Sequence, residues 1–258
     1  MLQRKRVSMS EVIRTTGLCK NNILFDVNFS MKKGELAAVM GPSGSGKSTL
    51  LYQLSGMDKP DKGQIIFSEE DICTCSEDER ADIRLNKMGF VFQQMNMLPD
   101  LNLMDNIILP ACQSQKMKKF GRKSEGQLKE EAASLMKKLG IAGLEKRKIT
   151  EVSGGQLQRA CICRAMMNHP ELLFADEPTG ALNKSSSEEI MEEFVRLNRE
   201  GMSILLVTHD SRVASRCNRV FFMEDGKITG EYILGKYEDA KKYDRETELN
   251  KWLEIHGW

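Results

Sequence analysis

The chain has 258 residues, of which 40% are hydrophobic, and its formal net charge is +1. This length predicts one large domain or two closely joined subdomains around a sizeable core. The near-zero charge argues against a nucleic-acid partner, and no apolar run reaches the roughly 18 residues that predict a membrane-spanning helix. Seven cysteines without C-x-x-C spacing favour reduced core thiols in a cytosolic compartment over a zinc site.

Four short apolar runs predict the buried parallel strands of an α/β fold, because they are apolar throughout rather than alternating. The runs are Leu36–Met40, Gly89–Phe92, Leu172–Ala175 and Ile204–Thr208. A residue suited to phosphate or proton chemistry follows each run, in chain order Gly41, Gln93, Asp176 and His209. Open α/β sheets bind ligands at the carboxyl ends of their strands. The pattern therefore predicts one ligand site at a single edge of the sheet.

The segment after the first run matches the P-loop pattern of nucleotide-binding proteins. Its glycines let backbone N–H groups fold around a phosphate where side chains would obstruct. We expect Lys47 to contact the β- and γ-phosphate oxygens and the Ser48 hydroxyl to bind Mg²⁺. The predicted nucleotide-binding residues are Gly41, Ser43, Gly44, Ser45, Gly46, Lys47, Ser48 and Thr49. A chance loop of glycine and serine is the alternative, and the buried strand before it argues against that interpretation.

Two adjacent carboxylates follow the third apolar run and suit metal-assisted hydrolysis. Asp176 is predicted to hold Mg²⁺ through water, and Glu177 to accept a proton from the water that attacks the γ-phosphate. The alternative is a pair of solvated acids before a turn. The P-loop favours the functional interpretation, because it requires such a strand elsewhere in the chain.

The segment Val152-Ser-Gly-Gly-Gln156 precedes a predicted helix, Leu157–Met167, and offers a hydroxyl and exposed amides as a second phosphate cradle. Two cradles in one chain favour a two-chain arrangement in which each completes the other chain's site. A surface turn that caps a helix is the alternative. The segment resembles the signature motif of ABC ATPases, and with the other motifs it makes residues 12–230 similar to ABC-transporter ATP-binding subunits. The residues expected to act in trans are Ser153, Gly154, Gly155 and Gln156.

The resemblance implies an α/β ABC ATPase core, with a parallel sheet and an N-terminal antiparallel subdomain, over residues 1–230. A helical subdomain at about 94–167 is expected to interrupt it, because the stretch Leu101–Met167 reads as largely helical, with residues 114–127 as an exposed loop. Gln93 resembles the Q-loop glutamine near Mg²⁺ and the attacking water. His209 resembles the H-loop histidine on the γ-phosphate and would pair with Glu177, although a structural hydrogen-bonding role is the alternative.

Finer features resemble the subfamily that serves lipoprotein release, macrolide export, bacitracin-type peptide resistance and the FtsE division protein. These features are the stretches Gly89-Phe-Val-Phe-Gln93, Asn96-Met-Leu-Pro99, Asp105-Asn-Ile-Ile-Leu-Pro110 and Asp176-Glu-Pro-Thr-Gly-Ala-Leu182. The resemblance implies an ATPase that uses ATP and Mg²⁺ and acts as a homodimer at the cytoplasmic face of the membrane. Its expected partner is an integral membrane permease of the FtsX type. Antimicrobial-peptide resistance or export is the leading hypothesis, and an FtsE-like signalling ATPase that moves no substrate is the alternative.

Two positions depart from the family pattern. Asn22 lies near the place of the aromatic ring that stacks on adenine, with Phe25 close by, and Asn183 replaces the aspartate of the D-loop. Residues 231–258 form a charged tail, predicted to be helical. Its apolar stripe, at helical spacing, consists of Leu249, Trp252, Leu253 and His256. We expect the stripe to dock on the chain's own core or on the permease, and a frayed terminus is the alternative.

Overall fold

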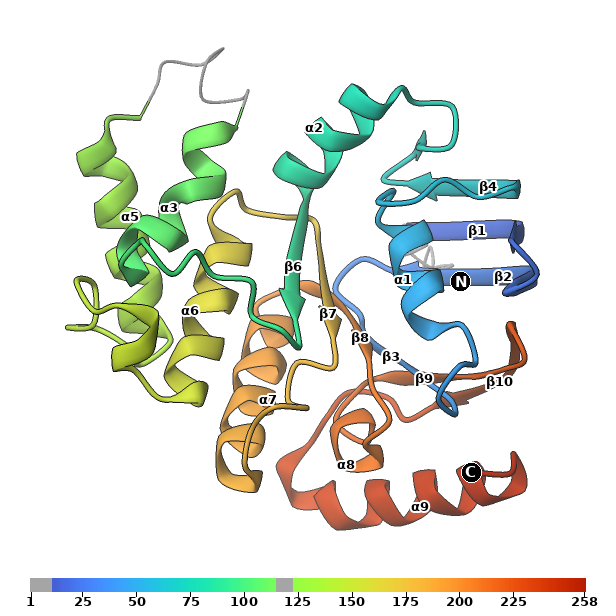
Figure 1. Cartoon of the computed structure of the whole chain (residues 1–258). Helices are drawn as coiled ribbons and strands as arrows, with labels where there is room; N and C mark the ends of the chain where they lie inside the picture. Colours follow the sequence, from blue (N-terminus) through green and yellow to red (C-terminus); the bar gives the residue numbers. More distant parts are fainter. Residues whose placement is uncertain (1–10, 115–122) are drawn as a thin grey trace, which may run out of the picture.

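The computed structural model describes residues 11–114 and 123–258, and within them two sheets form the core (Figure 1). The larger sheet has the strand order β10-β9-β3-β8-β7-β6, and the smaller has the order β2-β1-β4-β5. The strands of the larger sheet are β3 (Leu36–Met40), β6 (Met88–Phe92), β7 (Leu172–Asp176), β8 (Ser203–Val207), β9 (Arg219–Glu224) and β10 (Lys227–Ile233). Those of the smaller sheet are β1 (Glu11–Lys20), β2 (Leu24–Lys32), β4 (Lys62–Phe67) and β5 (Glu70–Asp71).

The four predicted strands lie within the larger sheet, each to within one residue of its predicted ends. β6, β7, β8 and β3 pair in parallel in that order, and β3 also pairs in parallel with β9. Every residue of β3 and β8 is buried, which explains why these strands are apolar except for Ser203 at the start of β8. The strands of the smaller sheet pair antiparallel. The predicted fold class, an α/β ABC ATPase core with an antiparallel subdomain, is confirmed.

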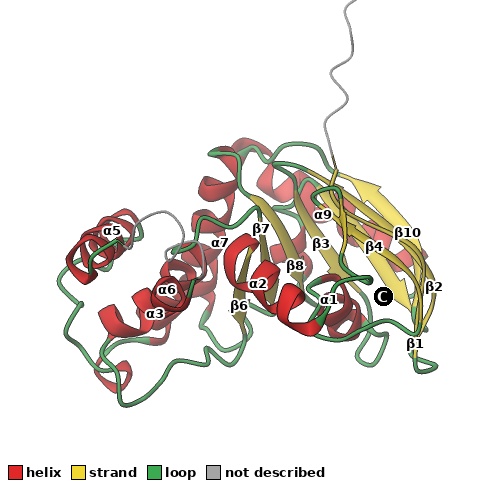
Figure 2. Ribbon diagram, turned by 90° about the horizontal axis from the view of Figure 1, so that it is seen from above, coloured by secondary structure: helices red, strands yellow, loops and turns green. Residues whose placement is uncertain are grey.

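Helices surround the parallel sheet and extend beyond β6 (Figure 2). They are α1 (Lys47–Leu54), α2 (Glu77–Lys87), α3 (Leu103–Gln113), α5 (Glu125–Lys138), α6 (Gly154–Met166), α7 (Lys184–Arg199), α8 (Ser211–Ala214) and α9 (Lys242–Ile255). Helices α3, α5 and α6 pack together as the helical subdomain, on the side of β6 away from α1. Among the residues described, no helix combines the length and apolar character needed to cross a membrane.

The loop prediction for residues 114–127 is wrong at its C-terminal end. The Ser124 hydroxyl accepts a hydrogen bond from the backbone N–H of Gln127, and the Gln127 side chain accepts one from the Ser124 N–H. This capping box starts helix α5 at Glu125. Residues 115–122 lie outside the described part of the chain. The helical stretch is also interrupted between α5 and α6, where only the short 3-10 turn Ile149–Glu151 is regular.

Helix α9 carries the apolar stripe of the tail and packs it against the edge of the larger sheet. Leu249 and Leu253 are fully buried in the main core. The Trp252 ring meets Phe222 of β9 edge-on at 6.3 Å and stacks on Tyr232 of β10 at 5.3 Å. The stripe therefore docks on its own chain, and the frayed terminus is wrong for these residues.

All seven cysteines are free thiols. Cys161, Cys163 and Cys217 are buried, and burial raises the pKa of Cys161 to about 11 and that of Cys163 to about 12. Such thiols stay protonated at neutral pH and are poor nucleophiles and metal ligands. These three cysteines are core residues, in keeping with the interpretation of the sequence.

Candidate nucleotide-binding site

The P-loop joins the end of β3 to the start of α1, and its glycines are required by its path. Gly41 has a φ of 150°, and a Cβ atom there would lie 1.9 Å from the carbonyl oxygen of Met223. Gly46 caps α1 in the left-handed conformation with a φ of 100°. A Cβ on Gly44, in contrast, would meet no atom within 4 Å, so the outer side of the loop is open. The loop thus presents backbone to its open side.

Lys47 and Ser45 turn polar atoms toward this loop. The Lys47 ammonium donates to the carbonyl oxygens of Gly41 and Pro42, both at 2.8 Å. Burial lowers the pKa of Lys47, although the charges of Glu177 and Asp176 oppose the shift. The Ser45 hydroxyl is buried and has no hydrogen-bond partner within the described residues. A buried, unpaired hydroxyl beside an ammonium suits an anionic ligand with oxygen atoms.

Asp176 ends β7 in register with Phe92 of β6 and Val207 of β8. Burial raises the pKa of its carboxyl group, the neighbouring Glu177 raises it further, and Lys47 and a hydrogen bond with Ser48 lower it. A hydroxyl and a carboxylate in contact form an oxygen donor set of the kind that Mg²⁺ prefers. The residues present therefore fit a magnesium ion.

Glu177 adopts a left-handed backbone conformation with a φ of 45°, which is unfavourable for a residue with a Cβ atom. Its backbone N–H donates to the carbonyl of Val207 at 2.9 Å, which holds the residue against β8. This conformation turns the chain away from β7 at the end of the sheet. Backbone strain at such a position is typical of functional sites.

His209 and Glu177 are brought together, as the predicted pairing requires. The His209 Nδ1 atom lies 2.8 Å from Glu177 Oε1. The Thr208 hydroxyl donates to Glu177 Oε2 at 3.3 Å and accepts from the N–H of Asp210 at 3.1 Å. The His209 side chain is 68% exposed while that of Glu177 is only 17% exposed, so the imidazole reaches outward from a more buried carboxylate.

Gln93 follows β6 at the same edge of the sheet. A Cβ atom on Gly180 would lie 3.0 Å from Gln93 Nε2, so the amide group lies against the turn after Glu177. The four strand ends thus gather Gln93, Asp176, Glu177 and His209 at one edge, next to the P-loop. This is the clustering that the strand pattern predicts.

The predicted signature residues form the start of α6. Ser153 is the N-cap and accepts from the Gln156 N–H, while the Gln156 side chain accepts from the Ser153 N–H. A Cβ on Gly154 would meet Leu182 at 3.3 Å, and one on Gly155 would meet Ser186 at 3.2 Å. The segment thus lies against the turn before α7 and the first turn of α7. In both views the N-terminal turn of α6 and the P-loop lie on opposite sides of β7 and α7, so one chain does not bring the two cradles together (Figures 1 and 2).

Two departures from the family pattern have local explanations. Asn21 and Asn22 have φ values of 44° and 55°, and Ile23 N–H donates to Lys20 at 2.7 Å, which defines a tight hairpin turn that favours asparagine. Phe25 is 40% exposed. Asn183 is the N-cap of α7, and its side-chain oxygen accepts from Ser186 N–H at 2.9 Å. That oxygen is therefore used within the chain.

Gly226 is a contributor that sequence reasoning missed. Its N–H donates to the Ser45 carbonyl at 3.0 Å, and its own carbonyl accepts from Phe25 N–H at 2.9 Å. It thereby supports the P-loop from the β9–β10 turn, where its φ is 75°. The pair Asp225-Gly226 is a sequence signal for a tight hairpin, but nothing in it indicates which loop the hairpin touches.

This site defines the class of P-loop nucleoside triphosphatases. The family model described as "ABC transporter" matches residues 24–180, and the chain belongs to that family. It is 39% identical over 227 residues to the lipoprotein-releasing system ATP-binding protein LolD of Aquifex aeolicus, covering 86% of this chain and 98% of that one. It is 38% identical over 232 residues to the macrolide export ATP-binding/permease protein MacB of Pasteurella multocida, covering 88% of this chain but only 34% of that relative.

Solved structures agree with this assignment. The ATP-binding cassette MJ0796, in a dimeric post-hydrolysis state bound to ADP and phosphate, superposes with a TM-score of 0.78 at 34% identity. The superposition covers 87% of this chain and all of the MJ0796 chain. A second dimeric structure of the same cassette gives a TM-score of 0.79 at 35% identity, with the same coverage. The chain is an ABC ATPase, as predicted.

Proposed function

We propose that two copies of this chain bind two Mg·ATP between them, hydrolyse the nucleotide and drive an FtsX-type permease. In this proposal the P-loop residues Gly41 to Thr49 hold the phosphates, with Lys47 on the β- and γ-oxygens. Ser48, Asp176 and Gln93 hold the magnesium ion. When bound, the ion supplies positive charge that offsets the negative charge of the phosphate oxygens. The contact between Ser48 and Asp176 beside Lys47 supports this assignment.

Glu177 is the proposed general base. Its carboxylate follows the metal-binding Asp176 directly, and His209 and Thr208 hold both of its oxygens by hydrogen bonds. A base needs a fixed position within hydrogen-bonding reach of the attacking water. The contact between His209 and Glu177 is the observation that carries the proposal, because it links the residue proposed to contact the γ-phosphate to the residue proposed to take the proton.

The second copy is proposed to supply Ser153, Gly154, Gly155 and Gln156 to the γ-phosphate. The exposed Ser153 and the first amides of α6 form a cradle without a cation or a base of its own. The dimeric states of the MJ0796 cassette support this arrangement. Asn183 is expected to shape the D-loop at the dimer interface through the cap that it forms on α7.

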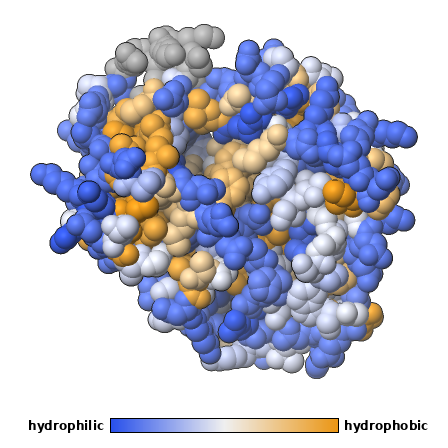
Figure 3. Space-filling view, viewed as in Figure 1, coloured by the Kyte–Doolittle hydropathy of each residue, from blue (hydrophilic) through white to orange (hydrophobic). Residues whose placement is uncertain are grey.

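A permease partner is supported by a groove of about 420 Å³ between α2 and the helical subdomain. Figure 3 shows apolar side chains in the hollow at this place. The larger apolar residues that line it include Met57, Leu85, Met88, Phe90, Phe92 and Leu109. We propose that a short amphipathic helix of the permease docks there, at the cytoplasmic face of the membrane. The name of the MacB relative, an ATP-binding/permease protein, supports such a pairing.

The transported substrate is proposed to be an antimicrobial peptide. A strain that lacks the chain is expected to become more susceptible to such peptides and to recover when the gene is restored, but not when Glu177→Gln is supplied. Unchanged susceptibility together with a division defect would instead favour the FtsE-like role.

The test of the proposed chemistry compares two Glu→Gln substitutions at opposite ends of β7. Glu177→Gln is expected to lower steady-state ATPase activity by at least about 100-fold while ATP still binds, because the general base is lost. Glu171→Gln removes a carboxylate from the other end of the strand, where it accepts a hydrogen bond from Ser68 at 2.6 Å. Its activity should stay near wild type. Wild-type turnover by Glu177→Gln would overturn the proposal.

A further inference from the structure

The segment that follows His209 begins with the short helix α8. Asp210 caps the one-turn helix α8 by accepting from Arg212 N–H at 2.8 Å. The Thr208 hydroxyl, which accepts from Asp210 N–H, also donates to Glu177. The N-terminal end of α8 is thus connected to the proposed base. Since the His209 side chain is 68% exposed, its position depends on its contact with Glu177 and on the backbone of this segment.

Two buried arginines bond at the C-terminal end of this segment: Arg216, which donates to the Glu188 carbonyl of α7 at 3.2 Å, and Arg245 of α9. Arg245 is 5% exposed, and its Nε atom donates to the Ser215 carbonyl at 2.9 Å. One Nη2 bond reaches the Cys217 carbonyl and one Nη1 bond reaches that of Leu234, both at 2.7 Å. Longer bonds of 3.3 Å reach Gly235 and Lys236. Arginine suits this position because its planar fork carries five donors.

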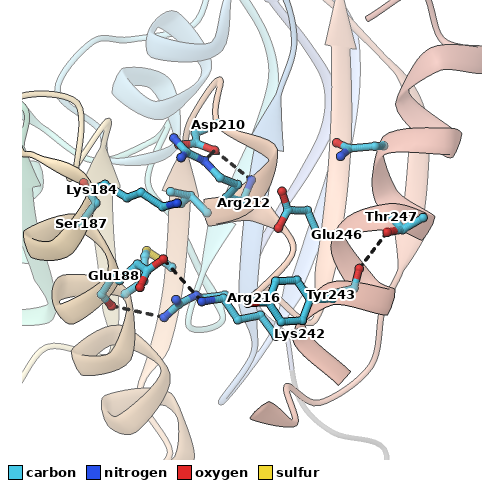
Figure 4. A pocket seen from close by; sticks show the side chains of 13 residues that line it. Lys184, Ser187, Glu188, Asp210, Arg212, Arg216, Lys242, Tyr243, Glu246 and Thr247 are labelled. Carbon is cyan, nitrogen blue, oxygen red and sulfur yellow. Dashed lines mark hydrogen bonds and ion pairs between the residues drawn. The ribbon is translucent and has the colours of Figure 1, made fainter. Parts of the chain in front are cut away.

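Side-chain packing between α8 and its helical neighbours is incomplete. A cavity of about 370 Å³ lies between α7, α8 and α9 (Figure 4). Arg212 and Val213 line it from α8, and Tyr243 and Glu246 line it from α9. Helices α8 and α9 also touch directly, and the bonds from Arg245 are a further link between α9 and the segment after His209. Val213 and Ala214 are nevertheless buried, which keeps α8 attached to the core without Arg245.

We infer that Arg245 is a positioning residue for ATP hydrolysis, which holds α8, and through it His209, in the place where the imidazole meets Glu177. The inference rests on the role proposed above for His209. The inference assigns helix α9 a role in ATP hydrolysis, because movement of α9 would loosen the segment that carries His209. Arg245 itself contacts neither Glu177 nor the P-loop in the bonds that it makes.

The experiment compares Arg245→Ala with a matched substitution on the same helix, Trp252→Ala. Both residues dock α9, but Trp252 packs on Phe222 and Tyr232 rather than on the carbonyls after α8. Arg245→Ala should lower kcat about ten-fold, equivalent to about 1.4 kcal/mol, with little change in KM. Trp252→Ala should keep kcat within about two-fold of wild type even where it lowers Tm equally. Arg245→Lys, which keeps the charge with fewer donors, should fall between wild type and Arg245→Ala.

A second readout follows His209 without ATP turnover. The chain has three histidines, so the ring signals in an NMR spectrum can be assigned by single substitutions. Arg245→Ala and Arg245→Lys should shift the His209 signal, and Trp252→Ala should leave it in place. Equal kcat losses in Arg245→Ala and Trp252→Ala, or an unmoved His209 signal, would overturn the inference. If Arg245→Ala does not fold, Arg245→Lys provides the test: a wild-type kcat and an unmoved His209 signal in that variant would overturn the inference. Wild-type activity in His209→Ala would instead refute the proposed role of His209, a result separable from the NMR comparison.

Discussion

The two helix N-termini that can cradle phosphate, those of α1 and α6, differ in what surrounds them. At α1, Lys47 lies beside the carboxylates of Asp176 and Glu177, and the burial of these groups shifts the pKa values of Lys47 and Asp176 unfavourably. At α6, the cap residues Ser153 and Gln156 satisfy each other, and the first turn carries no acidic residue. We call the α1 end charged, because ionisable groups are buried there. We call the α6 end relaxed, because its cap residues satisfy each other's hydrogen bonds.

This difference is consistent with the proposal that the two ends bind phosphate but that only the α1 end carries out hydrolysis. The α1 end can hold a metal-bound nucleotide and activate water, whereas the α6 end offers hydrogen-bond donors alone. The two ends lie on opposite sides of β7 and α7, and we therefore propose that the α6 end serves the site of a second chain (Figure 1). Substitutions at each end should therefore differ in their effects, and the largest effect is expected at the α1 end.

Lys47→Ala removes the cation from the α1 end. We expect ATPase activity to fall by about 100- to 1000-fold, because no other described cation is placed to contact the β- and γ-phosphate oxygens from this loop. Steady-state phosphate release measures the effect. Lys33→Ala, at an exposed lysine outside the site, is the matched control and should keep wild-type activity. An activity within a few-fold of wild type in Lys47→Ala would refute the P-loop assignment.

Ser153→Ala removes the cap of the α6 end. Loss of an N-cap hydroxyl costs about 0.5–2 kcal/mol, so the free energy of unfolding and Tm should both fall, the latter by a few degrees. Thermal unfolding without nucleotide measures the change. An unchanged or higher Tm would show that the Ser153 hydroxyl does not stabilise the start of α6.

Asp176→Asn, at the α1 end, should raise stability, in contrast to Ser153→Ala. Burial raises the pKa of Asp176 in the folded chain above its unfolded value, so the ionised carboxylate costs stability at pH values above the folded pKa. Its neutral replacement should raise Tm at pH 7 without nucleotide by about 2 °C. The gain should shrink as pH falls through the folded pKa, because the wild-type carboxyl group then becomes neutral too. A loss of stability at pH 7, or a gain that grows toward acid, would contradict this account.

The residues most accessible to sequence reasoning were those whose function depends on neighbours in the chain. Lys47, Asp176 and Glu177 occur in short patterns that follow buried strands, and parallel strand ends necessarily meet. The meeting of Glu177 with His209 was predictable for the same reason. Gly226 and Arg245 were not, because their partners Ser45 and Ser215 lie far away in the chain and no spacing rule connects them. The loop error before α5 came from a composition rich in lysine and serine that concealed a capping box.

The central claim is that the relaxed α6 end of one copy completes the charged α1 end of another. Its most direct test compares Glu177→Gln with the double variant Glu177→Gln/Gly154→Asp, by light scattering with and without Mg·ATP. Gly154 is exposed at the start of α6, where an acid is tolerated by the helix but would repel a phosphate. The account predicts that both variants bind ATP equally and that only Glu177→Gln becomes a dimer with ATP. Equal dimerisation of the two variants, or an ATP-saturated Glu177→Gln that remains a monomer, would contradict it.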